Sequence, residues 1–329
     1  MKIGFIGLGN AGSKLAKNLI NNNQKLLVND LDESLSDEFI KIGTQWAKYP
    51  SEISKDCNII ITCLPSPKAC SEVMEGKNGI LSNISKGQIW LEMSTTNSDE
   101  VKRIGKLVLD KNAEVLDCPV SGGCHRAATG NISLFAGGER ETFLKALPIL
   151  KILAQRILHT GELGSASILK VATNYLATVN LVSICEAFIT CNAHNLNLNT
   201  VFEAFKISSG NSFVHETEGQ VILNGSRDIN FTMDLVLKDI SLFQKLADLK
   251  KIPLELSPLI NEIFKDGIKK FGEREFSPNI IKRLENITGL SVLADGFPTE
   301  IIDDESPALG YEVIPKGIKK GQYKSALFI

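Results

Sequence analysis

Short apolar runs alternate with amphipathic stretches through the first half of the chain. Residues 3–6 and 58–63 are almost wholly apolar, as buried parallel strands are. Leu15, Ala16, Leu19 and Ile20 have the three-to-four spacing of a helix that buries one face. Further strand-like runs lie at 88–92, 114–119, 133–136 and 156–159, with helical stretches such as 99–112 and 139–154 between them. This alternation predicts a doubly wound α/β domain over residues 1–162.

The pattern changes after residue 162. Residues 165–195 contain no glycine or proline and predict one helix of about 45 Å, long enough to span two lobes. Later periodicity predicts helices over residues 198–208, 213–223, 233–250, 256–271 and 279–286. We therefore expect an all-α substrate or assembly domain over residues 163–289. Residues 290–329 are rich in turn residues, which predicts an irregular tail that wraps the body or is partly ordered.

Composition excludes several classes of protein. The length of 329 residues suits two domains. The net charge of −2, with no long basic run, argues against a nucleic-acid partner. Seven cysteines without a C-x-x-C pair indicate free thiols in a reducing compartment. The chain enters a strand at once, and no apolar stretch approaches the roughly 18 residues of a membrane span, so we expect a cytoplasmic protein with no membrane partner.

A glycine-rich turn follows the first apolar run and opens the first helix. Its sequence is Gly7-Leu8-Gly9-Asn10-Ala11-Gly12. Gly7 permits a tight turn, Gly9 lets the backbone approach a pyrophosphate, and Gly12 lets the helix pack close to the strand. The helix N-terminus offers N–H groups to the phosphates. In this context the turn predicts a Rossmann-type dinucleotide site and hence a redox enzyme.

Asp30 ends the second strand, eighteen positions after Gly12. A carboxylate near this spacing accepts hydrogen bonds from an adenosine ribose and repels a 2′-phosphate. Leu31 stands where an NADP site often has an arginine. These two residues favour NAD, although Asp30 would also suit a simple turn.

The segment Asp117-Cys118-Pro119-Val120-Ser121-Gly122-Gly123 ends a predicted strand. Consecutive glycines expose backbone N–H groups, and the Ser121 hydroxyl beside them completes a small anion cradle. The position suits a carboxylate-binding loop at the carboxyl end of the sheet, where such folds bind ligands. An ordinary turn explains the same residues equally well.

Lys170 and Asn174 lie one turn apart on the long predicted helix, so both can meet one ligand. Apolar neighbours would partly desolvate Lys170, and a dehydrogenase needs a base for the hydroxyl proton. The alternatives are a solvated lysine, or a histidine base, of which His125 lies nearest the two glycines. No histidine pair has metal-ligand spacing, so we expect no metal.

With these segments in view, the chain resembles the β-hydroxyacid dehydrogenase family from Lys2 to about Asn286. The matching segments are residues 7–12, Cys63-Leu64-Pro65, Glu92-Met93-Ser94-Thr95, residues 117–123, Gly161-x-x-Gly164 with Lys170 and Asn174, and Leu237-Lys238-Asp239. The resemblance implies that Leu64, Pro65, Thr95 and Lys238 contact the cofactor. It implies that Ser121, Gly122 and Gly123 hold a substrate carboxylate, that Asn174 orients the substrate, and that Lys170 exchanges the proton on the substrate oxygen.

The chain departs from the family after the two glycines. Cys124-His125-Arg126 stands where small residues are usual. His125 and Arg126 either enlarge the anion site, which would suit a doubly charged substrate, or face solvent.

The sequence thus predicts an NAD-dependent oxidoreductase that transfers hydride between nicotinamide and a short 3-hydroxy acid or its semialdehyde. The alternatives are reduction of an imine or a carbonyl without a carboxylate, and a non-catalytic NAD sensor or assembly protein. Imine-reducing relatives tend to replace the lysine, so Lys170 argues against the former. The family also implies a homo-oligomer, a dimer or a tetramer, with a small carboxylate as substrate.

Overall fold

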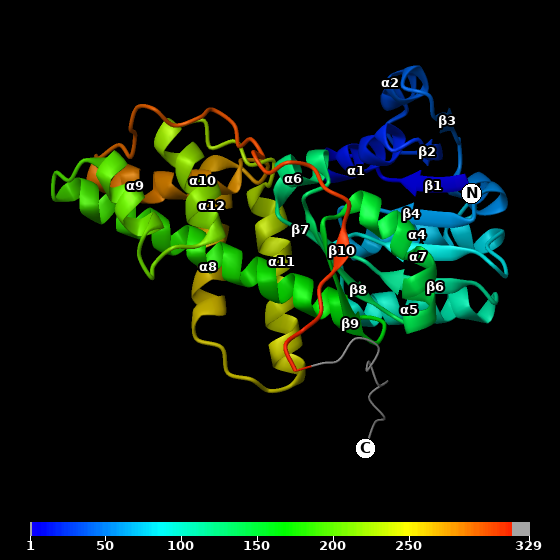
Figure 1. Cartoon of the computed structure of the whole chain (residues 1–329). Coiled ribbons are helices and arrows are strands. Elements are labelled where there is room, and N and C mark those ends of the chain that lie inside the picture. Colours follow the sequence, from blue (N-terminus) through cyan, green and yellow to red (C-terminus); the bar gives the residue numbers. More distant parts are fainter. Residues whose placement is uncertain (1, 318–329) are drawn as a thin grey trace. The chain divides into compact units, whose positions relative to one another are not determined.

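The computed structural model describes residues 2–317, and its contacts divide the chain into two units (Figure 1). The first unit holds the chain up to Lys170 together with the segment from Asp303 onward, and the second is Val171–Ile302. The chain therefore leaves the first unit within one helix and rejoins it near the C-terminal end.

A mixed sheet forms the centre of the first unit. Its strands are β1 (Lys2–Ile6), β2 (Lys25–Asn29), β3 (Gln45–Trp46), β4 (Ile59–Thr62), β5 (Ile89–Glu92), β6 (Glu114–Asp117), β7 (Val120–Ser121), β8 (Ser133–Gly137), β9 (Arg156–Gly161) and β10 (Tyr311–Glu312). Their order is β10-β9-β8-β6-β5-β4-β1-β2-β3, with β7 paired to β8. The β6–β8 and β7–β8 pairs are antiparallel and the others are parallel.

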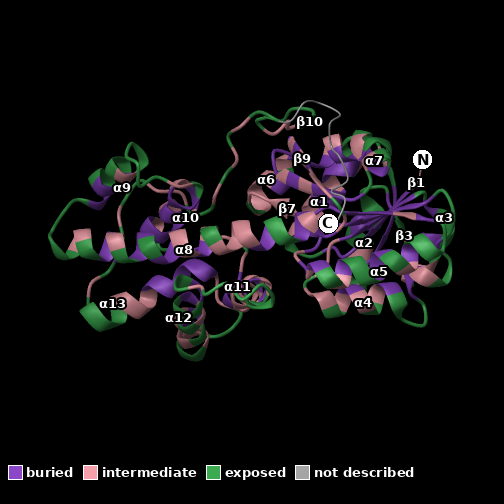
Figure 2. Cartoon of the chain, turned by 90° about the horizontal axis from the view of Figure 1, so that it is seen from below, coloured by how far each residue is buried: buried purple, intermediate pink, exposed green. Residues whose placement is uncertain are grey.

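The strand order reverses at β1, which lies between β2 and β4. Ligands bind outside the carboxyl ends of the strands at such a switch point. The β4 strand is buried along its whole length, as its apolar sequence requires, and Figure 2 shows the strands as a buried layer. The glycine turn after β1 therefore stands at the expected ligand position.

Helices flank the sheet. They are α1 (Asn10–Asn21), α2 (Ser36–Lys41), α3 (Pro50–Asp56), α4 (Pro67–Glu75), α5 (Ser98–Asp110), α6 (Gly123–Thr129) and α7 (Arg140–Leu153). Local chemistry starts several of them: the Ser66 hydroxyl accepts from the Ala69 N–H, and the Asn97 side chain accepts from the N–H groups of Asp99 and Glu100. Apolar stripes on helices such as α1, α5 and α7 then bury one face against the sheet.

The second unit is helical. After α8 (Ser165–Ala193), which begins in the first unit, it contains α9 (Leu198–Lys206), α10 (Phe213–Asn224), α11 (Met233–Leu249), α12 (Leu256–Phe271) and α13 (Lys282–Thr288). Side chains from these helices form its hydrophobic core, in which Phe188 and Phe264 are fully buried. The predicted Rossmann-type domain followed by helices is confirmed.

Three features differ from the sequence expectations. The segment after Asp117 contains the short strand β7 and the helix α6 in place of an open loop. Part of the tail forms β10 at the edge of the sheet. The α8 helix has the length and apolar composition of a membrane span, contrary to the expectation that no stretch approaches one, although core helices of soluble proteins meet the same test. The tail residues after 317 lie outside the described part of the chain.

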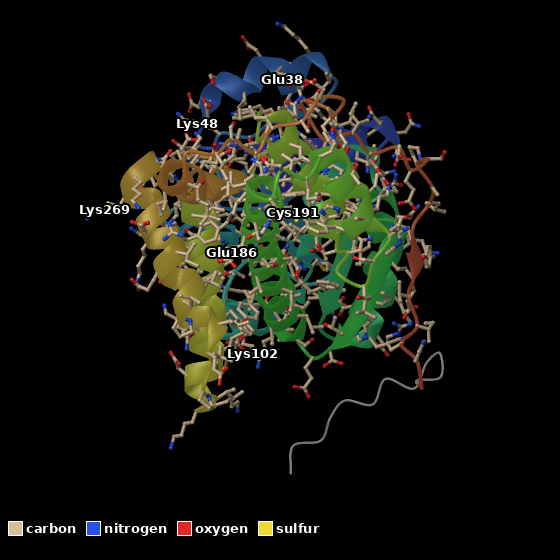
Figure 3. The ribbon with its side chains drawn as sticks, turned by 90° about the vertical axis from the view of Figure 1, so that its left-hand side faces the viewer. Glu38, Lys48, Lys102, Glu186, Cys191 and Lys269 are labelled. Carbon is tan, nitrogen blue, oxygen red and sulfur yellow. The ribbon has the colours of Figure 1, made fainter. Side chains whose placement is uncertain are left out.

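Charges of both signs lie on the surface. Glu38, Lys48, Lys102, Glu186 and Lys269 are all exposed and are labelled in Figure 3.

Candidate dinucleotide and substrate site

The glycine turn has the backbone geometry that a pyrophosphate needs. Gly7 has a φ of +94°, and a Cβ there would lie 2.3 Å from the Cys63 carbonyl oxygen. A Cβ at Gly12 would lie 2.0 Å from the Gly7 oxygen, whereas the space around Gly9 is open. Gly9 is the N-cap residue of α1, and no described side chain caps this helix end by a hydrogen bond. Its N–H groups and the open space at Gly9 therefore fit a bound phosphate.

Asp30 is tied to this turn. Its carboxylate accepts hydrogen bonds from the Leu8 N–H at 2.6 Å and from the Asp32 N–H at 2.9 Å. Each oxygen keeps lone pairs for a ribose hydroxyl. The Leu31 side chain is almost fully exposed and forms no wall beside it.

A buried carboxylate joins the next two segments that are predicted to contact the cofactor. Glu92, at the end of β5, accepts hydrogen bonds from the Thr62 hydroxyl and the Cys70 thiol, both at 2.8 Å, and from the Ser94 N–H at 2.7 Å. The Ser94 hydroxyl accepts from the Leu64 N–H at 2.8 Å. Burial raises the pKa of Glu92.

This network links the segments that contain Leu64-Pro65 and Thr95. The sequence had given Glu92 and Ser94 no role of their own. The position of these polar residues at the end of a buried strand was the one feature of the sequence that could have indicated this network.

The Ser-Gly-Gly loop (Ser121, Gly122 and Gly123) joins β7 to α6. Gly122 and Gly123 have φ values of +131° and +87°, which favour glycine. A Cβ at Gly123 would lie 2.7 Å from the His125 ring, and one at Gly122 would lie 3.4 Å from Arg126 Cδ. His125 and Arg126 therefore pack against the loop. The pKa of His125 is lowered, mainly because the ring is buried and to a smaller extent because the positive charge of Arg126 is close. The α6 helix packs on α1.

Asp117 joins the motif before the Ser-Gly-Gly loop to the start of α8. It is fully buried at the end of β6. It accepts hydrogen bonds from the Gly164 N–H at 2.8 Å, the Ser167 N–H at 2.8 Å and the Ser167 hydroxyl at 3.0 Å. Desolvation raises its pKa to about 6. The carboxylate thus caps the helix that carries Lys170, one turn before that residue.

Lys170 and Asn174 are one turn apart on α8. The Lys170 side chain is only 8% exposed, although Ile168 and Leu169 beside it are each about 40% exposed. A buried lysine is uncommon and needs a reason.

In the second unit Asp239 connects two predicted site residues. It accepts a hydrogen bond from the Asn174 amide at 2.6 Å and forms an ion pair with Lys238 at 3.1 Å. Asp239 is buried, so it holds both side chains from within the helical core. The sequence had placed it in a motif without a role.

Two of the four histidines are structural. His159 Nε2 lies 2.9 Å from the Gly138 carbonyl oxygen, and His215 Nε2 lies 2.9 Å from that of Phe202. Both side chains are buried, and His215 packs against Phe188 and Phe205. His125 remains the histidine that contacts the Ser-Gly-Gly loop.

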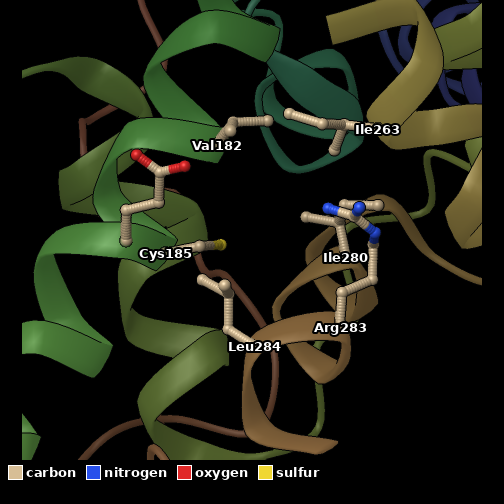
Figure 4. Close-up of a pocket in the computed structure, with 7 residues that line it drawn as sticks. Val182, Cys185, Ile263, Ile280, Arg283 and Leu284 are labelled. Atoms are coloured by element: carbon tan, nitrogen blue, oxygen red, sulfur yellow. The ribbon is translucent and has the colours of Figure 1, made fainter. Parts of the chain in front are cut away.

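A small pocket lies among helices of the second unit (Figure 4). Its lining residues are Val182, Cys185, Glu186, Ile263, Ile280, Arg283 and Leu284. None of these lining residues belongs to the glycine turn, to the Ser-Gly-Gly loop or to the Lys170 and Asn174 pair.

Comparison with known sequences defines the class of protein. Residues 2–161 match the NAD binding domain of 6-phosphogluconate dehydrogenase, and residues 164–284 match the NAD-binding domain of NADP-dependent 3-hydroxyisobutyrate dehydrogenase. With the glycine turn, these matches define an oxidoreductase that uses a nicotinamide dinucleotide.

Individual relatives narrow the class. The 2-(hydroxymethyl)glutarate dehydrogenase of Eubacterium barkeri is 30% identical over 293 residues, which cover 89% of this chain and 97% of that protein. The mitochondrial 3-hydroxyisobutyrate dehydrogenase of Rattus norvegicus is 31% identical over 283 residues, 84% of each chain. The solved structure of 3-hydroxyisobutyrate dehydrogenase (ygbJ) from Salmonella typhimurium has the same fold, with a TM-score of 0.79 at 22% identity, covering 86% of this chain and 99% of that one. The chain belongs to the β-hydroxyacid dehydrogenase family and is an NAD(P)-dependent hydroxyacid dehydrogenase.

Proposed function

We propose that the protein transfers hydride between NAD and a short 3-hydroxy acid or the corresponding semialdehyde, with Lys170 as the general acid and base. The observation that carries this proposal is the Asp117 clamp. It anchors both the motif that leads into the Ser-Gly-Gly loop and the start of α8, with bonds at 2.8 Å to Gly164 and Ser167. Lys170 follows Ser167 by one helical turn.

The residues support a division of labour. The nicotinamide, when bound, accepts or gives the hydride. The Ser121 hydroxyl and the backbone N–H groups of Gly122 and Gly123 would bind the substrate carboxylate and fix its orientation. The Lys170 amine would take the hydroxyl proton as the alcohol becomes a carbonyl, and return it in the reverse direction. Asn174 would hold the same oxygen, with its amide oriented by Asp239.

The relatives support the substrate class. The names of the two curated relatives specify hydroxy acids, one a dicarboxylate and one a monocarboxylate. Incubation with NAD and a panel of 3-hydroxy acids, followed by absorbance of the reduced cofactor, tests the proposal. We expect turnover of at least one acid, and turnover of none in either direction would contradict it.

The preference for NAD over NADP rests on Asp30. We expect Asp30→Ala to raise the NADP-to-NAD ratio of kcat/KM by about tenfold or more, because removal of one repulsive charge changes binding by roughly 1–2 kcal/mol. Asp32→Ala is the matched control, since Asp32 binds the Ser34 N–H and should leave the ratio unchanged. An unchanged ratio in Asp30→Ala would assign the preference to other residues.

Ser121→Ala should weaken carboxylate substrates far more than neutral carbonyls. A hydrogen bond to a charged group contributes about 1.5–3 kcal/mol, so we expect kcat/KM for acids to fall by roughly ten- to a hundredfold. Ser133→Ala is the control, because Ser133 is the strand partner of Ser121 in β8. Equal losses for charged and neutral substrates would favour reduction of a carbonyl that lacks a carboxylate.

A further inference from the structure

The C-terminal part of the first unit forms a segment that we call the return segment, residues 303–313. The Gly310 N–H donates to the Lys151 oxygen, that of Tyr311 to Gln155, and that of Val313 to Ile157, at 2.7–2.9 Å. A Cβ at Gly310 would lie 1.9 Å from the Ala154 carbonyl oxygen, so this close approach requires glycine. The segment is thus built into the edge of the sheet beside β9.

Its acidic side chains meet basic side chains of the first unit. Glu312 forms two hydrogen bonds with Arg140, at 2.6 and 3.0 Å, and Glu305 accepts from Arg156 at 2.8 Å. The Arg156 hydrogen bond lowers the pKa of Glu305. These pairs fix the segment by charge as well as by backbone bonds.

Asp303 connects the segment to the end of α6. It accepts hydrogen bonds from the Thr129 hydroxyl and, at 2.7 Å, from the Asn131 amide, which also donates to the Glu305 carbonyl at 2.6 Å. The Asp303 side chain is only 2% exposed. The carboxylate is therefore placed by several bonds that do not involve an arginine.

The Arg126 side chain extends from the Ser-Gly-Gly loop to two carboxylates of the return segment, Asp303 and Glu305. Its Cδ lies beside Gly122, and its guanidinium lies 3.9 Å from Asp303 Oδ1 and 3.7 Å from Glu305 Oε2. Two positive groups, Arg126 and Arg156, thus face two negative ones. The local charge next to the loop is balanced.

We propose that Asp303 and Glu305 are specificity-determining residues, which hold the Arg126 charge and so set the Ser-Gly-Gly loop for singly charged carboxylates. This rests on the proposed function of the loop. It is the opposite of one of the two alternatives left open by the sequence, namely that Arg126 enlarges the anion site for a doubly charged substrate. A second substrate carboxylate would find Arg126 already beside Asp303 and Glu305, the latter shared with Arg156, and gain little from it.

The test compares a dicarboxylic with a monocarboxylic hydroxy acid, 2-(hydroxymethyl)glutarate with 3-hydroxypropionate. In Asp303→Asn/Glu305→Gln the dicarboxylate-to-monocarboxylate ratio of kcat/KM should rise by about tenfold, since a released unit charge at a few ångströms acts on the second carboxylate. Adding Arg126→Gln to this variant should return the ratio toward the wild-type value. An unchanged ratio in the folded double variant would overturn the proposal.

Glu312→Gln is the matched control, because it removes an acidic partner from the same segment but pairs with Arg140. It should leave the ratio unchanged, and an equal rise would assign the effect to docking of the whole segment and overturn the proposal. If the double variant does not fold, Glu305→Gln alone keeps the Asp303 bonds to Thr129 and Asn131. It should raise the ratio several-fold, and no rise there would equally overturn the proposal.

A binding measurement separates this inference from the proposed function. Calorimetry measures the Kd values of malonate and acetate for the NAD-loaded wild type and variants. Malonate should bind more tightly relative to acetate in Asp303→Asn/Glu305→Gln than in the wild type. Wild-type inactivity with every acid would contradict the proposed function. An unchanged malonate-to-acetate ratio in the variants would contradict this inference alone.

Discussion

Lys170→Ala should lower kcat by roughly 10²–10⁴-fold, the usual contribution of a positioned general acid or base. NAD binding should persist, because the glycine turn and Asp30 form their contacts without Lys170. Steady-state kinetics, with cofactor affinity from fluorescence titration, measures both quantities. A loss in kcat and kcat/KM together, without loss of NAD affinity, is the pattern of an interaction made in the transition state.

Two further variants control this experiment. Lys170→Arg keeps the positive charge, but a guanidinium does not give up its proton in proteins, so this variant should remain impaired. Glu186→Gln changes an exposed charged side chain on the same helix and should behave as wild type. Normal turnover in Lys170→Ala would remove the proposed role.

Asp117→Ala should have the second largest effect, on both folding and turnover. It leaves the buried N–H groups of Gly164 and Ser167 without their acceptor. Loss of a cap and of buried hydrogen bonds should lower the free energy of unfolding by about 2–4 kcal/mol. Because α8 then starts without its anchor, kcat should fall about tenfold or more while KM for NAD changes little. Denaturant unfolding and kinetics measure the two effects, and Ser183→Ala farther along α8 is the control.

The pKa of Asp117 adds a pH test. Desolvation raises this pKa from its ordinary value of 3.8 to about 6, so the folded protein binds the proton more tightly than the unfolded chain. The stability from this group is present below about pH 4 and is lost as pH rises through about 6. The unfolding free energy of wild type relative to Asp117→Asn should therefore fall over this range. A difference that rises with pH would mean that the hydrogen bonds from Gly164 and Ser167, which favour the ionised carboxylate, outweigh its desolvation.

Most of the fold was predictable because its elements obey local rules. The apolar run at residues 59–62 and the glycine-free stretch that became α8 each determine one element by periodicity and length. The small strand β7 was not predictable, because two residues give no periodicity and its pairing to β8 depends on residues twelve or more positions away.

The residues of the candidate site also fall into those that could be predicted from the sequence and those that could not. The residues that we propose face a ligand, such as Gly9 and Lys170, belong to motifs whose spacing is visible in the sequence. The residues that hold them, such as Glu92 and Asp239, act through partners far along the chain, and their bonds need the fold. The pairing of Arg126 with Asp303 spans the whole second unit, so no local pattern could have shown it.

Transfer of a labelled hydride tests the central claim most directly. A 3-hydroxy acid that is turned over by the protein is prepared with deuterium in place of every hydrogen on its carbinol carbon and incubated with NAD. The account predicts that the deuterium appears at C4 of the reduced nicotinamide and that the acid becomes the semialdehyde. Reduced cofactor without deuterium, or loss of the acid without reduced cofactor, would contradict it.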